Sequence, residues 1–125
     1  ARDLQKRHDR WLKGKGLDGT CPMGPWIVPA EYVRDPADLE LHLTVNGETR
    51  QKAPIRDMIF DVVQLVSVLS QGLTLEPGDI IATGTPSGVG FAMQPPQLLA
   101  DGDIVEVSIS DIGMIFRNTV RRNAA

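Results

Sequence analysis

The chain has 125 residues, of which 42% are hydrophobic and 23% are charged, as in an ordinary globular domain or part of one. Its formal net charge of -3 argues against nucleic acid or an anionic membrane as a partner. The single cysteine, Cys21, excludes internal disulfides, and the apolar runs are too short to cross a bilayer. These features favour a cytoplasmic location. A charged start without methionine predicts that a segment precedes the chain.

The first part of the sequence is polar and contains many residues that interrupt regular structure. Residues 1–16 are basic and predict a short helix or a turn-rich segment that Gly14 and Gly16 close. Residues 17–29 contain several glycines and prolines. They predict a loop that ends in a short extended piece at 26–28.

A β-hairpin is the clearest local prediction. Residues 39–45, "LELHLTV", alternate between apolar and polar side chains, which is typical of a strand with one buried face. Asn46-Gly47 follows, and both residues accept the positive φ angles of a type I′ turn. The next residues, "ETRQK", then form the returning strand.

One helix is predicted in "DMIFDVVQLVSVLSQG", with Asp57 as the N-cap and Gly72 as the C-terminal stop. Its apolar residues fall at helical spacing and form a single stripe. The stripe consists of Ile59, Val62, Val63, Val66 and Leu69.

Three further strands are predicted, at 80–83, 104–110 and 114–120. Turns rich in glycine and aspartate lead into the first two of them. The order of elements predicts a mixed β fold with few helices, of the α+β class.

The stretch "IIATGTPSGVG" places hydroxyls and glycines directly after an apolar run. A phosphate-binding loop is disfavoured because Phe91 follows the last glycine and Pro95-Pro96 oppose an early helix. A simple tight turn remains an alternative for the glycines. Hydroxyls that follow a buried strand favour a binding role for Thr83 and Thr85.

Other chemical constellations are weak. His8 and His42 are isolated in the sequence, and His42 is interpreted as an exposed polar position of its strand. Asp101 and Asp103 fit a turn that enters a strand better than a cation site. Ser87 has no evident base for a catalytic triad.

The polar residues Arg2, Gln5 and Lys15 form another candidate set. In a helix, Arg2 and Gln5 would share one face. Together with Lys15 they would suit a carboxylate and an enolate. Spacing alone favours the alternative, a solvated basic surface.

Several motifs, taken in order, resemble the C-terminal part of the fumarylacetoacetate hydrolase family. They cover nearly the whole chain, and the later part is similar to bacterial hydroxyheptadienedioate isomerases and acylpyruvate hydrolases. The motifs are "ARDLQ", "GKGLDGTCPMGPW", "VNGETRQ", "MIF", "PGDIIATGTPSGVG" and "GDIVEVSISDIG".

This resemblance implies a β roll that lacks its N-terminal part here, so residues 1–125 are expected to be the C-terminal part of a single catalytic domain. The family is usually dimeric and uses Mg²⁺ or Mn²⁺ to act on 2-oxo and 1,3-dioxo acids. Its metal ligands are a Glu-x-Glu pair and an aspartate that precede "ARD". No metal ligand is therefore expected within this chain.

The resemblance also implies roles for individual residues. Lys15 and Gln5 would be catalytic and stabilise an enolate or oxyanion, while Arg2, Thr85 and Gly84 would bind the substrate. The expected reaction is hydrolysis of a C–C bond in acylpyruvate-like or fumarylacetoacetate-like acids. The alternatives are an isomerase or decarboxylase of aromatic catabolism, and a non-catalytic fragment that only dimerises.

Overall fold

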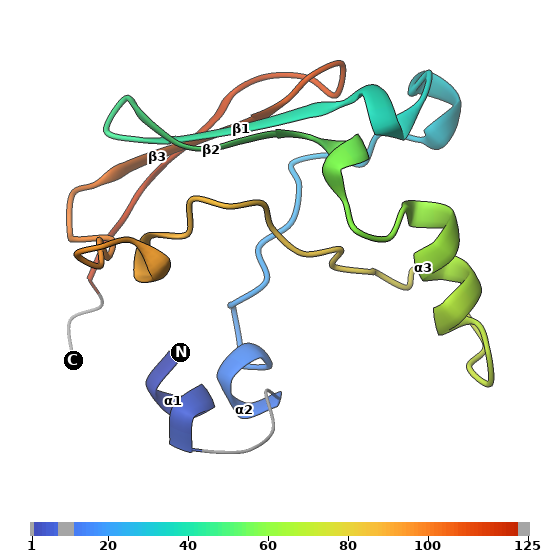
Figure 1. The fold of residues 1–125 in the computed structure, drawn as a ribbon, viewed down its shortest axis with the longest axis horizontal. Helices are drawn as coiled ribbons and strands as arrows, with labels where there is room; N and C mark the ends of the chain where they lie inside the picture. Colours follow the sequence, from blue (N-terminus) through green and yellow to red (C-terminus); the bar gives the residue numbers. More distant parts are fainter. Residues whose placement is uncertain (1, 8–11, 123–125) are drawn as a thin grey trace.

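The computed structural model describes residues 2–7 and 12–122, and its centre is an antiparallel four-stranded sheet in the order β2-β1-β3-β4 (Figure 1). The strands are β1 (Glu40–Val45), β2 (Glu48–Pro54), β3 (Ile104–Ile109) and β4 (Phe116–Thr119). The α-helices are α1 (Arg2–Arg7), α2 (Leu12–Lys15) and α3 (Val62–Leu69). Short 3₁₀ helices are η1 (Ala30–Tyr32), η2 (Pro36–Asp38), η3 (Ile55–Asp57) and η4 (Gly90–Ala92). The predicted mixed β class with few helices is confirmed.

The predicted hairpin is formed by β1 and β2. Asn46 and Gly47 connect them with φ angles of 53° and 81°, as a type I′ turn requires. The other edge of β1 pairs with β3, which the chain reaches only after more than fifty further residues. The hairpin is thus local, whereas the rest of the sheet depends on long-range pairing.

A β-bulge interrupts the pairing of β1 with β2. Leu43 lies opposite Gln51, but the next residue, Thr44, lies opposite Thr49, so Arg50 is an extra residue in β2. Such a bulge bends a strand and changes the direction in which neighbouring side chains point. It occurs in an edge strand of the sheet, next to Gln51.

The predicted start of α3 was wrong. The helix begins at Val62 with Asp61 as its N-cap, and Asp57 belongs to η3 instead. Asp61 accepts a hydrogen bond from the Gln64 backbone, and the Gln64 side chain accepts one from the Asp61 backbone. Three residues after Asp57 stands Phe60, which cannot complete such a reciprocal capping box.

The strand predicted at 80–83 was also wrong. This segment is extended but pairs with no strand among the described residues, and the Ile80 side chain is 62% exposed. The apolar run predicted a buried strand, but an apolar composition does not supply the neighbouring strand with which it would have to pair. The last predicted strand is present in a shorter form, as β4.

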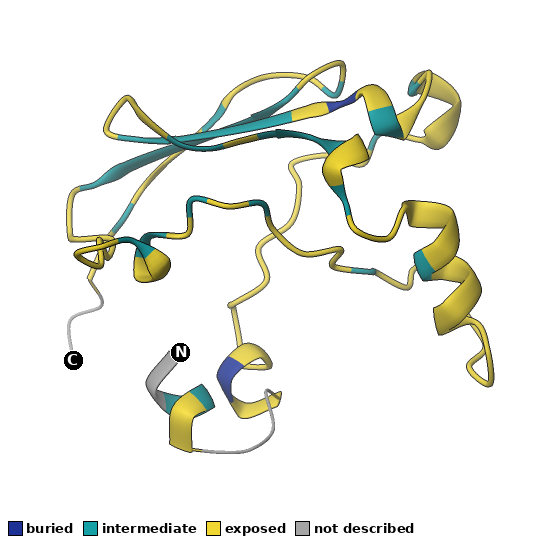
Figure 2. Ribbon diagram, in the orientation of Figure 1, coloured by how far each residue is buried: buried dark blue, intermediate teal, exposed yellow. Residues whose placement is uncertain are grey.

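Little of the described chain is buried (Figure 2). Among the described residues, Leu39, with 7% exposure, is the one large side chain in the buried class. The apolar stripe of α3 is largely exposed, and Ile59, which lies before the helix, is 91% exposed. Within the described part of the chain, α3 is the longest helix at eight residues and could not cross a membrane.

A polar clamp joins the hairpin turn to the start of β3. Asn46 donates from Nδ2 to Asp103 Oδ1 at 2.9 Å and accepts the backbone N–H of Ile104 at 2.9 Å. Asp103 Oδ2 accepts the backbone N–H of Ala100 at 2.7 Å. These contacts confirm the predicted strand-entry turn. The Ala100 N–H first, then the Asn46 amide, hold the pKa of Asp103 below its ordinary value of 3.8.

Because folding lowers the pKa of Asp103, its carboxylate stabilises the fold above its ordinary pKa, and this contribution is lost as pH falls through the lowered value. Asp103→Ala is therefore expected to lower the urea midpoint of the whole protein at neutral pH, and the difference from wild type should shrink as pH falls below 3.8 and through the lowered pKa. Asp101→Ala controls for the loss of one acidic residue from the same turn. A difference that stays the same over this pH range would contradict this role for Asp103.

Candidate active site

Three of the predicted site residues lie on α1 and α2, two short helices that pack against each other. Arg2 and Gln5 share α1, as predicted from their spacing, and Lys15 is the last residue of α2. The side chain of Arg2 lies outside the described part of the structure. The structure therefore brings the elements of Gln5 and Lys15 together.

Gln5 carries an unsatisfied amide. Its side-chain Nε2 is buried, and it finds no hydrogen-bond partner among the residues that the structure describes. A buried donor without a partner costs about 1–3 kcal/mol. Such a group fits a position that is completed by a ligand or by another part of the whole protein.

Lys15 is the last residue of α2, so this part of the segment predicted as a short helix or a turn-rich stretch is helical. Gly14 is buried inside α2, and the Gly16 backbone N–H still donates to the Leu12 carbonyl at 2.7 Å. The Thr20 hydroxyl is within hydrogen-bond distance of the Lys15 and Leu17 carbonyls, at 3.2 and 2.6 Å. The backbone of Lys15 is thus fixed, while its side chain remains exposed.

The loop that carries Thr85 is attached to the edge of the sheet through Gln51 of β2. The Gln51 side chain donates from Nε2 to Thr85 Oγ1 at 2.7 Å and to the Pro86 carbonyl at 2.8 Å. Gly84 precedes Thr85 with a φ of 106°, and open space surrounds the position of a Cβ there. A ligand could therefore approach the backbone at Gly84 closely.

At Gly88 the loop has no room for a side chain. A Cβ at Gly88 would lie 1.7 Å from the Arg50 carbonyl oxygen and 3.2 Å from Gln51 Cγ. The loop backbone therefore rests directly on the bulge of β2. The glycines of "TPSGVG" permit close contact between two backbones, which agrees with neither a phosphate-binding loop nor a simple solvent-exposed turn.

Arg50 secures the next part of the same segment. Its guanidinium donates to Met93 Sδ at 3.0 Å and to the Gln97 side-chain oxygen, and it pairs with Glu48 at 3.4 Å. A Cβ at Gly90 would lie 2.0 Å from the Gln97 carbonyl oxygen. Residues 85–97 thus cover the edge of β2, which would otherwise be open to pairing with another chain.

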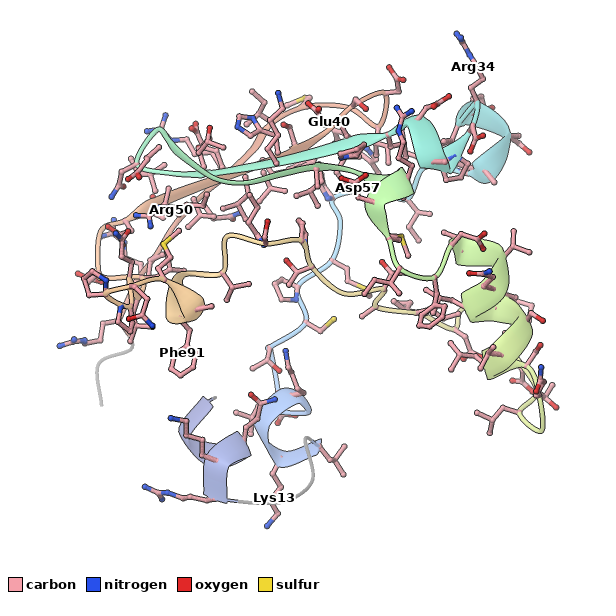
Figure 3. All side chains as sticks on the ribbon, in the orientation of Figure 1. Lys13, Arg34, Glu40, Arg50, Asp57 and Phe91 are labelled. Atoms are coloured by element: carbon pink, nitrogen blue, oxygen red, sulfur yellow. The ribbon has the colours of Figure 1, made fainter. Side chains whose placement is uncertain are left out.

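Two aromatic side chains connect this loop and the sheet to the N-terminal helices. Phe91 extends from η4 towards α1 and α2 (Figure 3), and Lys6 Nζ lies 5.3 Å from its ring centroid. Trp26, in the segment after α2, donates to the Ile112 carbonyl at 3.3 Å and packs edge-on against Phe116 at 5.5 Å. The helices with Gln5 and Lys15 are therefore tied to both the loop and the sheet.

The described residues do not fit a metal site. Over residues 2–7 and 12–122, no three His, Cys, Asp or Glu side chains lie close enough to hold a metal ion. Asp101 accepts the backbone N–H of Arg122 at 2.7 Å. His42 is half-buried, not exposed as predicted, and its Nε2 lies 2.9 Å from Thr49 Oγ1. His8 lies outside the described residues.

A pocket elsewhere in the molecule contains none of the predicted site residues. It lies between η2, η3 and the start of α3, and its lining is mainly apolar. Its one basic side chain, Arg56, lies 3.8 Å from Asp38. This pocket offers no set of hydrogen-bond donors for an anion.

The chain matches the family model described as "Fumarylacetoacetate (FAA) hydrolase C-terminal" over residues 1–121. It is 51% identical over 115 residues to the oxaloacetate tautomerase YisK of Bacillus subtilis, covering 92% of this chain and 38% of that protein.

Two solved structures are also similar. The fumarylacetoacetate hydrolase of Exiguobacterium antarcticum has a TM-score of 0.90 and 50% identity, covering 98% of this chain and 44% of that one. A maleylpyruvate hydrolase from Sphingobium sp. SYK-6, in complex with manganese(II) and pyruvate, has a TM-score of 0.72 and 44% identity, with 83% and 36% covered. The chain thus spans less than half the length of each of these three proteins.

Gly88→Ala is expected to detach residues 84–90 from β2, because the added methyl would meet the Arg50 carbonyl. Gly78→Ala is a matched control, since Gly78 has nearly the same φ, 104° against 102°, and has open space around it. Both variants should lose about 1–2 kcal/mol through left-handed backbone strain, and Gly88→Ala about 1–3 kcal/mol more through overpacking. Hydrogen exchange of peptides that cover 84–90 measures the detachment. Equal protection of these amides in the two variants would contradict the close contact.

Proposed function

Because the chain belongs to the fumarylacetoacetate hydrolase family, we propose that the whole protein is a hydrolase that cleaves a C–C bond in 2-oxo or 1,3-dioxo acids. Residues 1–125 form the C-terminal part of its catalytic domain. Acylpyruvates and fumarylacetoacetate-like acids are the proposed substrate class. The maleylpyruvate hydrolase in complex with pyruvate, a 2-oxo acid, supports this class.

One structural observation supports the proposal: three candidate hydrogen-bond donors lie on elements that are linked by contacts. The Gln5 amide nitrogen is buried without a partner among the described residues, Lys15 ends the adjoining helix, and Thr85 is held on β2. The Lys6–Phe91 contact links α1 to the loop of Thr85. A 2-oxo acid presents a carboxylate and an oxygen that becomes negative during reaction, and both require donors.

The proposed roles follow from the charge of each group. Lys15 and Gln5 stabilise the oxyanion or enolate, because a cation and an amide N–H lower the energy of a negative charge that develops during the reaction. Thr85 donates its hydroxyl to the carboxylate, with Arg2 as a second partner and the Gly84 backbone leaving space for the substrate. In hydrolysis, the water oxygen bonds to the carbonyl carbon, the C–C bond breaks, and the leaving enolate carbon takes a proton.

Tautomerisation is the second candidate reaction, supported by the 51% identity to an oxaloacetate tautomerase. It requires the same stabilised enolate, but a proton moves between carbon and oxygen and no C–C bond is broken. The donors of this chain serve both reactions equally. Isomerisation or decarboxylation of acids from aromatic catabolism is a further alternative, because it would use the same enolate.

We also propose that the whole protein uses Mg²⁺ or Mn²⁺, bound by residues other than those described here. The manganese complex of the maleylpyruvate hydrolase supports the type of cation. Homodimeric assembly and a cytoplasmic location remain predictions from the sequence.

The reaction class is tested by assaying the whole protein with oxaloacetate and a panel of acylpyruvates. Turnover of at least one substrate is expected, with loss of activity in EDTA and recovery when Mn²⁺ or Mg²⁺ is added. Cleavage products distinguish hydrolysis from tautomerisation. Activity that is unchanged by a chelator, or no turnover of any 2-oxo acid in the presence of Mn²⁺, would contradict the proposal.

Lys15→Met should lower kcat by about 10²–10³-fold, because it removes one oxyanion partner. The fold should be retained, since the Lys15 side chain is exposed. Lys13→Met is the matched control, because Lys13 is an exposed lysine of the same helix. Equal kcat values for the two variants would remove Lys15 from the mechanism.

Thr85→Val should raise KM for the substrate by about 10–100-fold, the cost of one hydrogen bond to a charged group. Ser87→Ala should leave KM near the wild-type value, because Ser87 is exposed and has no hydrogen bond in the described structure. A larger effect of Ser87→Ala would show that the serine, and not Thr85, contacts the substrate.

A further inference from the structure

Gln51 connects the edge of the sheet to the loop that carries Thr85. It is half-buried, it follows the extra residue of the β2 bulge, and its amide contacts two consecutive residues of the Thr85 loop. Gln51 lies in the motif "VNGETRQ", and no sequence pattern predicts a role for it.

The Pro86 carbonyl fixes the orientation of the Gln51 amide. A carbonyl oxygen can only accept a hydrogen bond, and proline has no backbone N–H, so the NH₂ group of Gln51 must face Pro86. The same nitrogen lies 2.7 Å from Thr85 Oγ1. Its second hydrogen therefore goes to the Thr85 hydroxyl, which acts as the acceptor.

This arrangement determines what Thr85 can do. A hydroxyl that accepts a hydrogen bond keeps its own hydrogen for donation in another direction. The described residues provide no second partner for the Thr85 hydroxyl, and the residue is exposed. Its hydrogen is thus directed away from Gln51, where an anionic oxygen would be the best acceptor.

We propose that Gln51 is a positioning residue that holds the Thr85 hydroxyl as a donor towards the carboxylate or oxyanion of a 2-oxo acid. This inference rests on the proposed function, and within it on the role of Thr85. The bulge at Arg50 aims the Gln51 side chain, and the contact of Gly88 with the Arg50 carbonyl keeps the loop within its reach.

Gln51→Met and Gln51→Glu test the proposal in the whole protein. Methionine keeps the length but removes both donors, and KM for the 2-oxo acid should rise by about 5–15-fold with a smaller change in kcat. Glutamate keeps the shape but accepts hydrogen bonds, so the Thr85 hydroxyl would donate to it and turn away from the substrate. The KM of Gln51→Glu should therefore improve as pH falls and the new carboxyl becomes protonated.

The decisive comparison is with Thr85→Val. In that background Gln51→Met should raise KM no further, because both changes remove the same interaction. Lys52→Met controls for substitution on the same strand, since Lys52 pairs with Glu40 at 3.3 Å and does not contact the loop. If Gln51→Met fails to fold, the proposal is tested by the pH dependence of KM in the near-isosteric variant Gln51→Glu.

The roles proposed for Gln51 and for Thr85 can be refuted separately. A raised KM in Thr85→Val together with a wild-type KM in Gln51→Met, or additive effects in the double variant, would overturn only the role of Gln51. A wild-type KM in Thr85→Val would refute the proposed role of Thr85, and the role of Gln51 with it. A Gln51→Glu defect that does not change with pH would also contradict the directed donor.

Discussion

The close contact of Gly88 with the bulged carbonyl of Arg50 is the constraint on which the rest of the candidate site depends. It allows a loop backbone to lie against an edge strand without a side chain between them. In that position the Gln51 amide reaches both Thr85 and Pro86. The same contact places residues 85–97 over an exposed strand edge, which protects it from pairing with another chain. The contact between Gly88 and Arg50 thus helps both to cover the edge of β2 and to position the Thr85 hydroxyl.

The candidate site draws on residues from regions that are far apart in the sequence. Gln5 and Lys15 belong to the first helices, Gln51 to the hairpin, and Thr85 to a loop that follows α3. The contacts of Trp26 and Phe91 hold these regions together. The groups named are donors, which suits an anionic 2-oxo acid. A family that contains both hydrolases and tautomerases needs such a set, because both reactions pass through an enolate or oxyanion.

Local chemistry accounts for what the sequence could predict. The alternation of 39–45 and the Asn46-Gly47 turn are decided by neighbouring residues, and the hairpin was correct. The start of α3 was missed because two aspartates were available and only Asp61 has a glutamine three residues later. The strand at 80–83 was wrong because pairing depends on a partner that composition does not reveal.

The sequence suggests which residue types a candidate site would use, but not how the fold holds them in place. Thr85 was identified from hydroxyls after an apolar run, and Lys15 and Gln5 mainly from a family resemblance. Gln51 could not be recognised, because its role arises from a bulge and from a loop more than thirty residues away. The unsatisfied amide of Gln5 is likewise visible only when its surroundings are known.

The most direct test of the account is a crystal structure of the whole protein with Mn²⁺ and pyruvate. The pyruvate carboxylate is expected to accept a hydrogen bond from the Thr85 hydroxyl while Gln51 Nε2 still donates to Thr85. Lys15 Nζ and Gln5 Nε2 are expected to lie within hydrogen-bond distance of the pyruvate oxygens. Pyruvate bound away from Thr85, or a Thr85 hydroxyl that donates to Gln51, would contradict these roles.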